Sequence, residues 1–320
     1  MAKLNTPFRI GIVPIDGFAL MSYAALVEPL RAANVLSGQE LYDVSVVQTG
    51  PNPAQSSGGD LVPRQVKLNR TTSFDLAVLV AAGNALDYQN GQLANWLKAI
   101  SRKGTQIGGV SAGPLFLARN GLLNGRRMTI HWEHSDYLLE IAPDAILEPS
   151  LYVIDRDRLT CGGGTAPIDL MLALISNHHG QKLAQLVGDW FLHTSIRPSA
   201  GPQRSSLAQR YGTTNASVLA AIEAMETHVA NPLNLQDLAK IAGTSPRQLI
   251  RQFLRTVGVT PISFGRKIRL SKAHTLLQTA SLSISEIALM TGFSSPAHFS
   301  SSYSEAYEQA PSKSRGKTKI

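Results

Sequence analysis

The C-terminal part of the chain contains a helix-turn-helix pattern twice, and this duplication limits the possible folds more than any other feature of the sequence. The first copy covers residues 235–253 and the second covers residues 284–303. Apolar positions, a glycine and a Ser-Pro pair recur in the same order, as Leu235, Leu238, Ala239, Gly243, Ser245-Pro246, Leu249 and Phe253, and then as Ile284, Ile287, Ala288, Gly292, Ser295-Pro296, Phe299 and Tyr303. Each residue type has a separate geometric task, so composition alone does not explain the repeat. The sequence therefore predicts two helix-turn-helix units on one chain.

The first copy has the residues that a tight turn between two helices needs. Gly243 accepts the positive φ of the turn. Ser245 is expected to cap the second helix, with Pro246 at its first position. Leu249 and Phe253 are four residues apart and would anchor that helix on the core.

The second helix of the first copy then has polar residues on its outward face. These residues are Arg247, Gln248, Arg251 and Arg255. Arg can bind guanine and Gln can bind adenine through two hydrogen bonds each, and residues at the start of a recognition helix reach deepest into the major groove. We therefore expect Arg247 and Gln248 to contact bases, Arg251 and Arg255 to contact phosphates, and Ser245 to lie in the same interface. A solvated basic face is the alternative, which the duplication makes less favoured.

The second copy has a different outward face. Its predicted DNA contacts are Ser294, Ser295, His298 and Ser301, and no Arg or Lys occurs from Ser281 through Ser312. Hydroxyl groups can bind phosphates and His298 can meet a base edge, but such contacts release few counterions. The first unit is therefore expected to supply most of the electrostatic affinity.

The positive charge of the chain is concentrated in the same part. Residues 1–206 contain 17 Lys and Arg against 16 Asp and Glu, a net charge of +1, whereas residues 207–320 contain 13 against 6, a net charge of +7. A basic domain favours polyanions because counterions are released on binding. The charge supports double-stranded DNA as the partner of the repeat, although a basic surface alone often serves only solubility.

Simple features of the sequence exclude several other classes of protein. No segment approaches the roughly 20 apolar residues of a membrane helix, and the start MAKLNTPFRIGIV lacks a signal-peptide pattern. Cys161 is the only cysteine, and no Cys or His cluster has zinc spacing. We therefore expect a cytoplasmic protein of two or three domains, with no membrane contact, no metal and no cofactor.

The first half of the chain alternates short β-branched runs with helical patterns. Strands are expected at residues 8–13, 44–49, 76–81 and 106–110, and helices at 22–33, 93–101, 114–120, 166–176 and 183–192. Leu151 to Thr160 is expected to form a hairpin or an edge strand. This order predicts βαβ units around a largely parallel sheet, and hence an α/β domain. From Val218 onward the patterns are helical, which predicts an all-α domain.

A segment rich in Pro, Gly, Ser and Arg separates the two halves. It reads SIRPSAGPQRSSLAQRYGTTN between Ser195 and Asn215. Such a composition cannot bury an apolar face, so a linker is expected here. The expected organisation is a ligand-sensing domain at 1–195, a linker at 196–215 and a DNA-binding domain at 216–320.

A short glycine-serine motif follows one of the expected strands. Gly109-Val110-Ser111-Ala112-Gly113 matches the G-x-S-x-G nucleophile elbow, which exposes a serine between a strand and a helix. His131 is the candidate base for a serine hydrolase or amidase that would use Ser111. The motif is short and common in glycine-rich chains, so a ligand pocket at the same place is the main interpretation.

The geometry that stabilises an oxyanion also suits a bound carboxylate, because backbone N–H groups and the helix dipole face it. Ser111 and Ala112 would form one wall of the pocket, and the loop Ala82-Gly83-Asn84 would form another. The remaining predicted ligand-binding residues are Phe18, Tyr23, His131 and Trp132. The three aromatic residues among them could enclose a quaternary ammonium group. For His131, a hydrogen-bonded structural role is an equal alternative.

The C-terminal hundred residues resemble the DNA-binding domain of the AraC/XylS family. The resemblance rests on LQDLAKIAGTSPRQLIRQF, GVTPISFGRKIRLSKAHTLLQ and ISEIALMTGFSSPAHFSSSY. It implies that the long helix near 261–279 holds the two units so that they enter successive major grooves on one face of DNA. The family usually has a basic residue where Ser301 and Ser304 stand here, which weakens the expected second contact.

The first two hundred residues are similar to the class I glutamine amidotransferase-like, or PfpI-type, domain that is joined to AraC modules in a subset of regulators. The likeness rests on GFALMSYAALVEPLRAAN, ARNGLLNGRRMTIHW, GGTAPIDLMLALI and Gln203-Arg204. It implies a flavodoxin-like parallel sheet sandwich. Catalytic members carry a cysteine at the elbow, usually followed by histidine in the PfpI branch, where this chain has Ser111 and Ala112. This departure favours a ligand site without catalysis.

The two resemblances together imply a ligand-responsive, sequence-specific DNA-binding regulator of transcription, and more specifically an activator of amino-acid or methylated-amine catabolic genes. The expected effector is an amino acid or a quaternary amine carboxylate. A homodimer and contact with RNA polymerase are further expectations. The alternative is a serine hydrolase or amidase that uses Ser111 and is localised on DNA by its C-terminal half.

Overall fold

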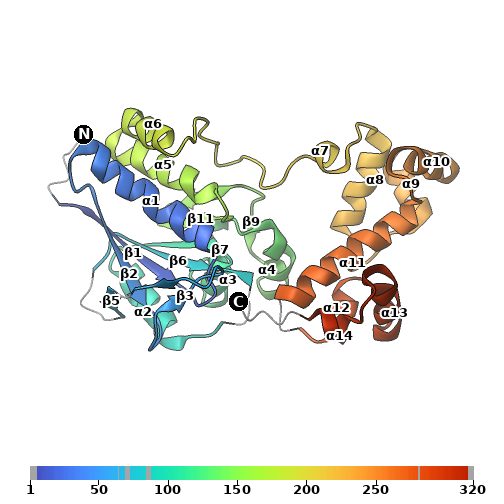
Figure 1. The fold of residues 1–320 in the computed structure, drawn as a ribbon, viewed down its shortest axis with the longest axis horizontal. Helices are drawn as coiled ribbons and strands as arrows, with labels where there is room; N and C mark the ends of the chain where they lie inside the picture. The colour runs from blue at the N-terminus through green and yellow to red at the C-terminus, as the bar shows by residue number, and fades with distance from the viewer. Residues whose placement is uncertain (1–5, 64, 69–72, 84–87, 280–281, 316–320) are drawn as a thin grey trace. The chain divides into compact units, whose positions relative to one another are not determined.

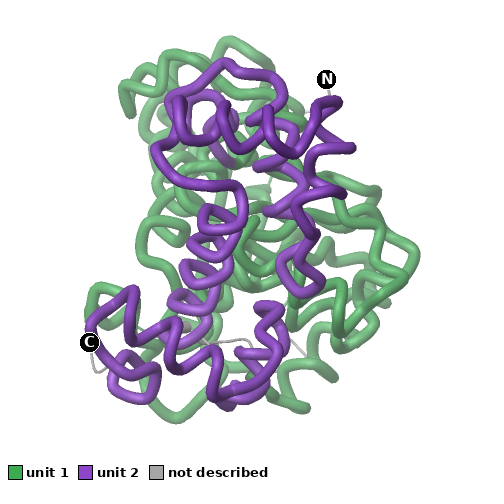
Figure 2. Tube along the Cα trace, turned by 90° about the vertical axis from the view of Figure 1, so that its right-hand side faces the viewer, with its two compact units in different colours: residues 1–203, 320 green, residues 204–319 purple. Residues whose placement is uncertain are grey.

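The computed structural model describes residues 6–63, 65–68, 73–83, 88–279 and 282–315, and it divides the chain into two compact units (Figure 2). Unit 1 ends at Gln203 and unit 2 begins at Arg204. Each unit has hydrophobic clusters of its own, as expected for domains with separate cores. Within these described ranges, no helix is long and apolar enough to cross a membrane.

Unit 1 is built around a seven-stranded sheet with the order β10-β11-β7-β6-β1-β2-β5 (Figure 1). In that order the strands are β10 (Tyr152–Asp155), β11 (Arg158–Cys161), β7 (Gln106–Ser111), β6 (Leu76–Ala81), β1 (Phe8–Pro14), β2 (Tyr42–Gln48) and β5 (Val66–Lys67). The neighbouring strands pair in parallel, except that β10 runs antiparallel to β11 at the edge. The carboxyl ends of β1, β6 and β7 therefore meet at one edge of the sheet, where open α/β sheets bind ligands.

Helices cover both faces of this sheet. α1 (Leu20–Ser37), α5 (Ala166–His179) and α6 (Gln181–Trp190) pack against one another on one face, and α2 (Gly91–Arg102) lies on the other (Figure 1). α3 (Gly113–Arg119) follows β7 directly and packs against β6 and β7. Apolar residues of β1, β6, α1 and α5 share one core. The predicted α/β sandwich with a largely parallel sheet is confirmed.

Several short elements of unit 1 have no counterpart in the sequence analysis. They are the pairs β3 (Ala54–Gln55) with β4 (Leu61–Val62) and β8 (Arg127–Met128) with β9 (Ile146–Leu147), the 3-10 turn η2 (Trp132–His134) and the helix α4 (Ser135–Ile141). A strand of two residues has no period to detect, so only contacts with the rest of the fold specify it. The segment expected as a hairpin or an edge strand is both, since β10 and β11 form a hairpin at the sheet edge.

The described part of unit 2 is helical. Its helices are α7 (Leu207–Tyr211), α8 (Ala216–Thr227), α9 (Leu235–Ile241), α10 (Pro246–Val257), α11 (Pro261–Thr279), α12 (Ile284–Met290), α13 (Pro296–Tyr307) and α14 (Pro311–Ser314). α9 with α10, and α12 with α13, form the two predicted helix-turn-helix units. α11 contributes Phe264 and Ile268 to the core of the first unit, and Leu270 and Leu277 to the core of the second. One helix therefore supports both units (Figure 1).

The segment 196–215, which was expected to be a linker, makes specific contacts on both sides of the boundary between the units. Arg197 holds the fully buried Asp169 of α5 with hydrogen bonds of 2.6 and 2.9 Å. Further along, α7 packs on α8, where the Tyr211 hydroxyl donates to Glu226 at 2.7 Å. The boundary between the units lies inside this segment.

Candidate functional site

The first helix-turn-helix unit exposes a basic helix whose start is fixed by a capped turn. Gly243 in the turn has a φ of 63°, as its sequence predicts. Ser245 Oγ accepts a hydrogen bond from Gln248 N at 3.3 Å, and Leu249 and Phe253 are fully buried. The exposed side chains of α10 include the predicted DNA contacts Arg247, Gln248, Arg251 and Arg255. The sequence therefore located both faces of this helix, and Ser245 serves to fix where it begins.

The second helix-turn-helix unit has the same capped turn but exposes different side chains. Gly292 has a φ of 69°, and Ser295 Oγ accepts a hydrogen bond from His298 N at 3.1 Å. The Nδ1 atom of His298 lies 3.1 Å from the hydroxyl of Ser294. Ser294, His298 and Ser301 are exposed, whereas Ser295 is half-buried as the cap of α13. This face offers hydroxyls and an imidazole, but no guanidinium or ammonium group.

α11 sets the separation between the two helix-turn-helix units. It contains 19 residues, which at ~1.5 Å per residue span about 28 Å. Half-sites in successive major grooves on one face of B-DNA lie about 34 Å apart. A rigid helix of this length, with one unit packed at each end, suits two contacts separated by about one turn of DNA.

The G-x-S-x-G motif forms a strained elbow at the end of β7. Ser111 has a φ of 59°, a left-handed conformation that costs a residue other than glycine about 1–2 kcal/mol. The two glycines are needed for packing, because an added Cβ would lie 2.9 Å from Pro114 N at Gly109 and 2.6 Å from Leu79 O at Gly113. The backbone of the motif thus adopts the predicted elbow geometry, but the side chain of Ser111 is buried and not exposed as expected.

The donors at this elbow differ from those that the sequence suggested. Ala112 N donates to Ala81 O at 3.3 Å, Leu115 N donates to Ala112 O at 3.1 Å, and Pro114 has no N–H group. α3 is also only seven residues long, so its macrodipole is small. Strand and helix pairing thus occupies the N–H groups of Ala112 and Leu115, and a bound carboxylate at the elbow stays a prediction.

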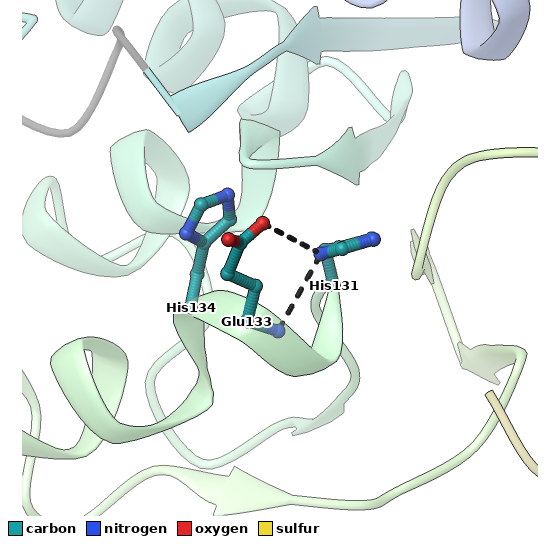
Figure 3. A group of neighbouring side chains, drawn as sticks. All are labelled: His131, Glu133 and His134. Carbon is teal, nitrogen blue, oxygen red and sulfur yellow. Dashed lines mark hydrogen bonds and ion pairs between the residues drawn. The ribbon is translucent and has the colours of Figure 1, made fainter. Parts of the chain in front are cut away.

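His131 lies beside the elbow and is held by its neighbours. Its backbone N–H donates to Ser111 O at 3.3 Å. Its Nδ1 atom accepts a hydrogen bond of 3.4 Å from Glu133 N and lies 3.8 Å from Glu133 Oε2 (Figure 3). Burial lowers the pKa of His131, which favours the neutral imidazole. These contacts direct Nδ1 toward the turn that follows His131.

His131, Glu133 and His134 form the grouping that comes nearest to a metal site among the described residues (Figure 3). Their candidate ligand atoms all lie within 4.8 Å of one another. The absence of a metal stays a prediction.

Gly163, beside the elbow, and Ser22, which holds the same glycine run, were not singled out by the sequence analysis. Gly163 has a φ of 85°, and a Cβ there would lie 2.7 Å from Ser111 Cβ and 3.0 Å from Ser22 Oγ. Ser22 is fully buried in the first turn of α1, where its hydroxyl accepts a hydrogen bond from Gly164 N at 2.9 Å. The run of three glycines at 162–164 was the available signal, since close approach of two backbones requires it.

The predicted aromatic residues occupy different environments. Phe18 is fully buried, with its ring 5.3 Å from that of Tyr23, and it belongs to the core of unit 1. Trp132 is 40% exposed, with its ring 5.3 Å from that of His131. The side chain of Phe18 is therefore not accessible to a ligand, whereas the side chain of Trp132 is accessible.

The loop expected to form another wall follows the strand next to the elbow. Ala81 pairs with Ser111 in the register of β6 with β7, so Ala82 and Gly83 emerge beside the elbow. Asn84 lies outside the described residues.

A cleft of ≈ 260 Å³ opens at the carboxyl ends of β1 and β2. Its lining includes Pro14, Asp16, Val46, Pro53 and Tyr88. None of the predicted ligand-binding residues with a described position lines this cleft. It was missed because its lining combines the ends of β1 and β2 with loop residues that form no recognisable motif.

Comparison with known families matches both units. The profile of the DJ-1/PfpI family matches residues 9–177, and the profile of a helix-turn-helix domain matches residues 238–317. The first match covers the sheet up to α5, and the second covers both helix-turn-helix units except the first three residues of α9.

Relatives that match nearly the whole chain are regulators of transcription. The HTH-type transcriptional regulator GlxA of Rhizobium meliloti (strain 1021) is 42% identical over 304 residues, which cover 95% of this chain and 94% of that relative. The HTH-type transcriptional regulator CdhR of Pseudomonas aeruginosa is 38% identical over 301 residues, which cover 94% and 89%.

Solved structures support the fold of unit 1. An AraC family transcriptional regulator from Pseudomonas putida is 24% identical with a TM-score of 0.52, over 58% of this chain and 100% of that chain. A ThiJ/PfpI family protein from Pseudomonas syringae is 18% identical with a TM-score of 0.51, over 74% and 91%. The two profile matches and the two relatives establish that the chain belongs to the family of HTH-type transcriptional regulators in which a DJ-1/PfpI domain precedes an AraC-type helix-turn-helix domain.

Proposed function

We propose that this protein is a ligand-responsive transcriptional regulator whose unit 2 binds double-stranded DNA sequence-specifically. The observation that carries the proposal is the pair of capped helix-turn-helix units packed at the two ends of α11. Two recognition helices on one rigid support suit an asymmetric DNA site of two half-elements.

The two helix-turn-helix units of unit 2 contact DNA differently in this proposal. Arg247 and Gln248, at the exposed start of α10, contact base edges, and Arg251 and Arg255 contact phosphates. In the second unit, the hydroxyls of Ser294 and Ser301 bind phosphates and His298 meets a base edge. Ser245 and Ser295 act through their caps, which fix where α10 and α13 begin.

Unit 1 is the sensor in this proposal. Its effector site lies at the carboxyl edge of the sheet, beside the elbow, with Ser111, Ala112, Ala82, Gly83, His131 and Trp132 around it. Asn84, which the sequence also predicts for this site, lies outside the described residues. An exposed indole beside an imidazole suits an amino acid or a quaternary amine carboxylate. We extend the proposal to a homodimer that activates amino-acid or methylated-amine catabolic genes through RNA polymerase.

Selection of bound duplexes from a random DNA library by the full-length protein tests the DNA part. The expected result is one enriched site whose two elements are separated by about 10 base pairs, one turn of DNA. Arg247→Ala should relax the preference in one element only, because each good base contact contributes about 1–3 kcal/mol of discrimination. A library that returns no enriched sequence would contradict the proposal.

A thermal-shift screen with the amino acids, glycine betaine and carnitine tests the sensor part. One of these compounds should raise the melting temperature of the wild-type protein, because binding to the folded state alone stabilises it. The same compound should lose its effect in Trp132→Ala, which removes the exposed indole proposed to contact it. No response to any of them would rule out this class of effector.

The hydrolase alternative has weaker support. The N–H of Ala112, which would serve an oxyanion hole, is bonded to Ala81 O, and Nδ1 of His131 is directed to Glu133. The regulators GlxA and CdhR also match the chain over 95% and 94% of its length. We therefore propose that the protein is not an enzyme. Ester or amide turnover that disappears in Ser111→Ala, with DNA binding intact, would favour the alternative.

A further inference from the structure

Gln203, the last residue of unit 1, is bound to the backbone on both sides of His131. Its Oε1 atom accepts a hydrogen bond from Trp132 N at 2.8 Å, and its Nε2 atom donates to Ile130 O at 2.9 Å. The same Nε2 donates to Ser150 O at 2.7 Å. The side-chain amide thus acts as a strand partner for the residues around His131.

Two backbone segments connect these contacts to the elbow. The first is His131 itself, whose N–H donates to Ser111 O at 3.3 Å. The second is a pair of consecutive glycines. A Cβ at Gly162 would lie 2.8 Å from Gln203 Cδ, and a Cβ at Gly163 would lie 2.7 Å from Ser111 Cβ. A molecule that binds against Ser111 would therefore contact residues 130–132 or 162–163, which also contact Gln203.

The residue after Gln203 is held by unit 2. Arg204 Nη1 lies 3.8 Å from Glu226 Oε2 on α8. Arg210 holds the same carboxylate through two hydrogen bonds of 2.7 Å. Gln203 and Arg204 are consecutive in the chain, with Cα atoms ~3.8 Å apart, so a displacement of the Gln203 backbone is passed directly to Arg204.

We propose that Gln203 is the positioning residue through which occupancy of the elbow site acts on the DNA-binding unit. This inference rests on the effector site proposed above. A molecule bound against Ser111 shifts the backbone at 130–132 or at 162–163 and so alters the hold on Gln203, and Arg204 moves with it. The ligand needs only to favour one arrangement of this segment over another.

Arg197 provides a contrast on the same segment. Its guanidinium is bound to Asp169 and to Thr165, on and before α5, and neither residue lies in 130–132 or 162–163, the segments that connect Gln203 to Ser111. Arg197 therefore binds the segment 196–215 to unit 1 alone. Gln203 binds the same segment to unit 1 and also contacts the residues that pack against the elbow. Loss of either anchor should loosen the segment, but only loss of Gln203 should disconnect it from Ser111.

Hydrogen exchange of the full-length protein, followed by mass spectrometry, tests the proposal. Ser111→Asp places a carboxylate at the elbow in place of a bound ligand, and Asp tolerates the positive φ there. This variant should change the exchange rate of the amides at 204–211 by about three- to tenfold, the effect of gaining or losing one or two net hydrogen bonds. Gln203→Met keeps the size of the side chain but removes its hydrogen bonds, and it should abolish the response to Ser111→Asp.

The matched control is Arg197→Met, in which the response at 204–211 should persist. A response of the same size in the Gln203→Met background would overturn the proposal, and so would the absence of any response in Ser111→Asp alone. If melting shows that Gln203→Met unfolds unit 1, Gln203→Glu replaces it, because a carboxylate cannot donate to Ile130 O. Neither DNA nor an effector enters this experiment, so its failure leaves the proposed DNA binding intact, and failure of DNA binding leaves this coupling in place.

Discussion

Arg269 of α11 donates a hydrogen bond of 2.6 Å to the carbonyl oxygen of Gly292, so the shared helix holds the turn of the second helix-turn-helix unit directly. The same guanidinium lies over the ring of Phe293, 4.6 Å from its centroid. The turn is also packed against the loop between α8 and α9, since a Cβ at Gly292 would lie 2.5 Å from Val229 O. The second helix-turn-helix unit is therefore positioned by contacts with the rest of unit 2 as well as by its own core.

The two turn glycines should respond differently to the same substitution. Gly292→Ala adds a backbone clash to the cost of a positive φ and should lower the free energy of unfolding of unit 2 by about 3 kcal/mol. Gly243→Ala is the matched control, because it has a φ of 63° but no atom within 4 Å of its added Cβ, and it should cost only about 1 kcal/mol. Urea denaturation measures both values. An equal loss of unfolding free energy in the two variants would contradict the close contact between Gly292 and the loop at Val229.

A second glycine pair tests the elbow. Gly163→Ala would bring its Cβ to within 2.7 Å of Ser111 Cβ, so it should lower the free energy of unfolding of unit 1 by about 3 kcal/mol. Gly164→Ala has a φ of 59° and open space around its Cβ, and should cost about 1 kcal/mol. Thermal melting of the two variants checks the order. A Gly163→Ala protein as stable as Gly164→Ala would place Gly163 away from the elbow.

The stability of unit 1 should fall as the pH falls below about 6.5. Burial lowers the pKa of His178, and the neighbouring His179 lowers it further. Because the pKa is lower in the folded state than the ordinary value of 6.5, the unfolded chain takes up the proton first. The stabilisation is therefore complete above pH 6.5 and is lost as the pH falls from there toward the folded-state pKa.

His178→Gln should make this loss of stability with falling pH shallower. The measurement is the melting temperature of unit 1 at several pH values between about 7.5 and 5, a range that spans the ordinary histidine pKa. The variant loses contacts with the ring of Phe8, 4.6 Å away, so its melting temperature at neutral pH is also expected to be lower. A pH dependence as steep as that of the wild-type protein would assign the effect to other groups.

The sequence predicted the elements that have a strong local pattern. The strand at 76–81 was placed at the same residues as β6, because six buried residues in a row have a clear signature. The two helix-turn-helix units were located by their caps and turn glycines, each of which has a local geometric cause. The elbow followed from the spacing of Gly109, Ser111 and Gly113, whose packing requires small residues.

Features that depend on distant residues were beyond the sequence. The role of Gly163 appears only when β11 and α1 bring it against Ser111 and Ser22. Gln203 was part of a segment without an apolar period, yet its amide is fixed by three backbone groups from two segments far away in the chain, residues 130–132 and Ser150. Phe18 was expected in a ligand pocket, but its aromatic ring fills the core, because a pattern cannot tell a pocket wall from a core position.

The unequal charge of the two helix-turn-helix units is the most direct test of how this protein binds DNA. The dissociation constant for a selected duplex should be measured at several salt concentrations for the wild-type protein, Arg251→Ala and Ser301→Ala. Arg251→Ala should reduce the slope of log K against log salt by about 0.9, the share of one phosphate contact, whereas Ser301→Ala should leave it unchanged. Equal slopes for the two variants would contradict the account.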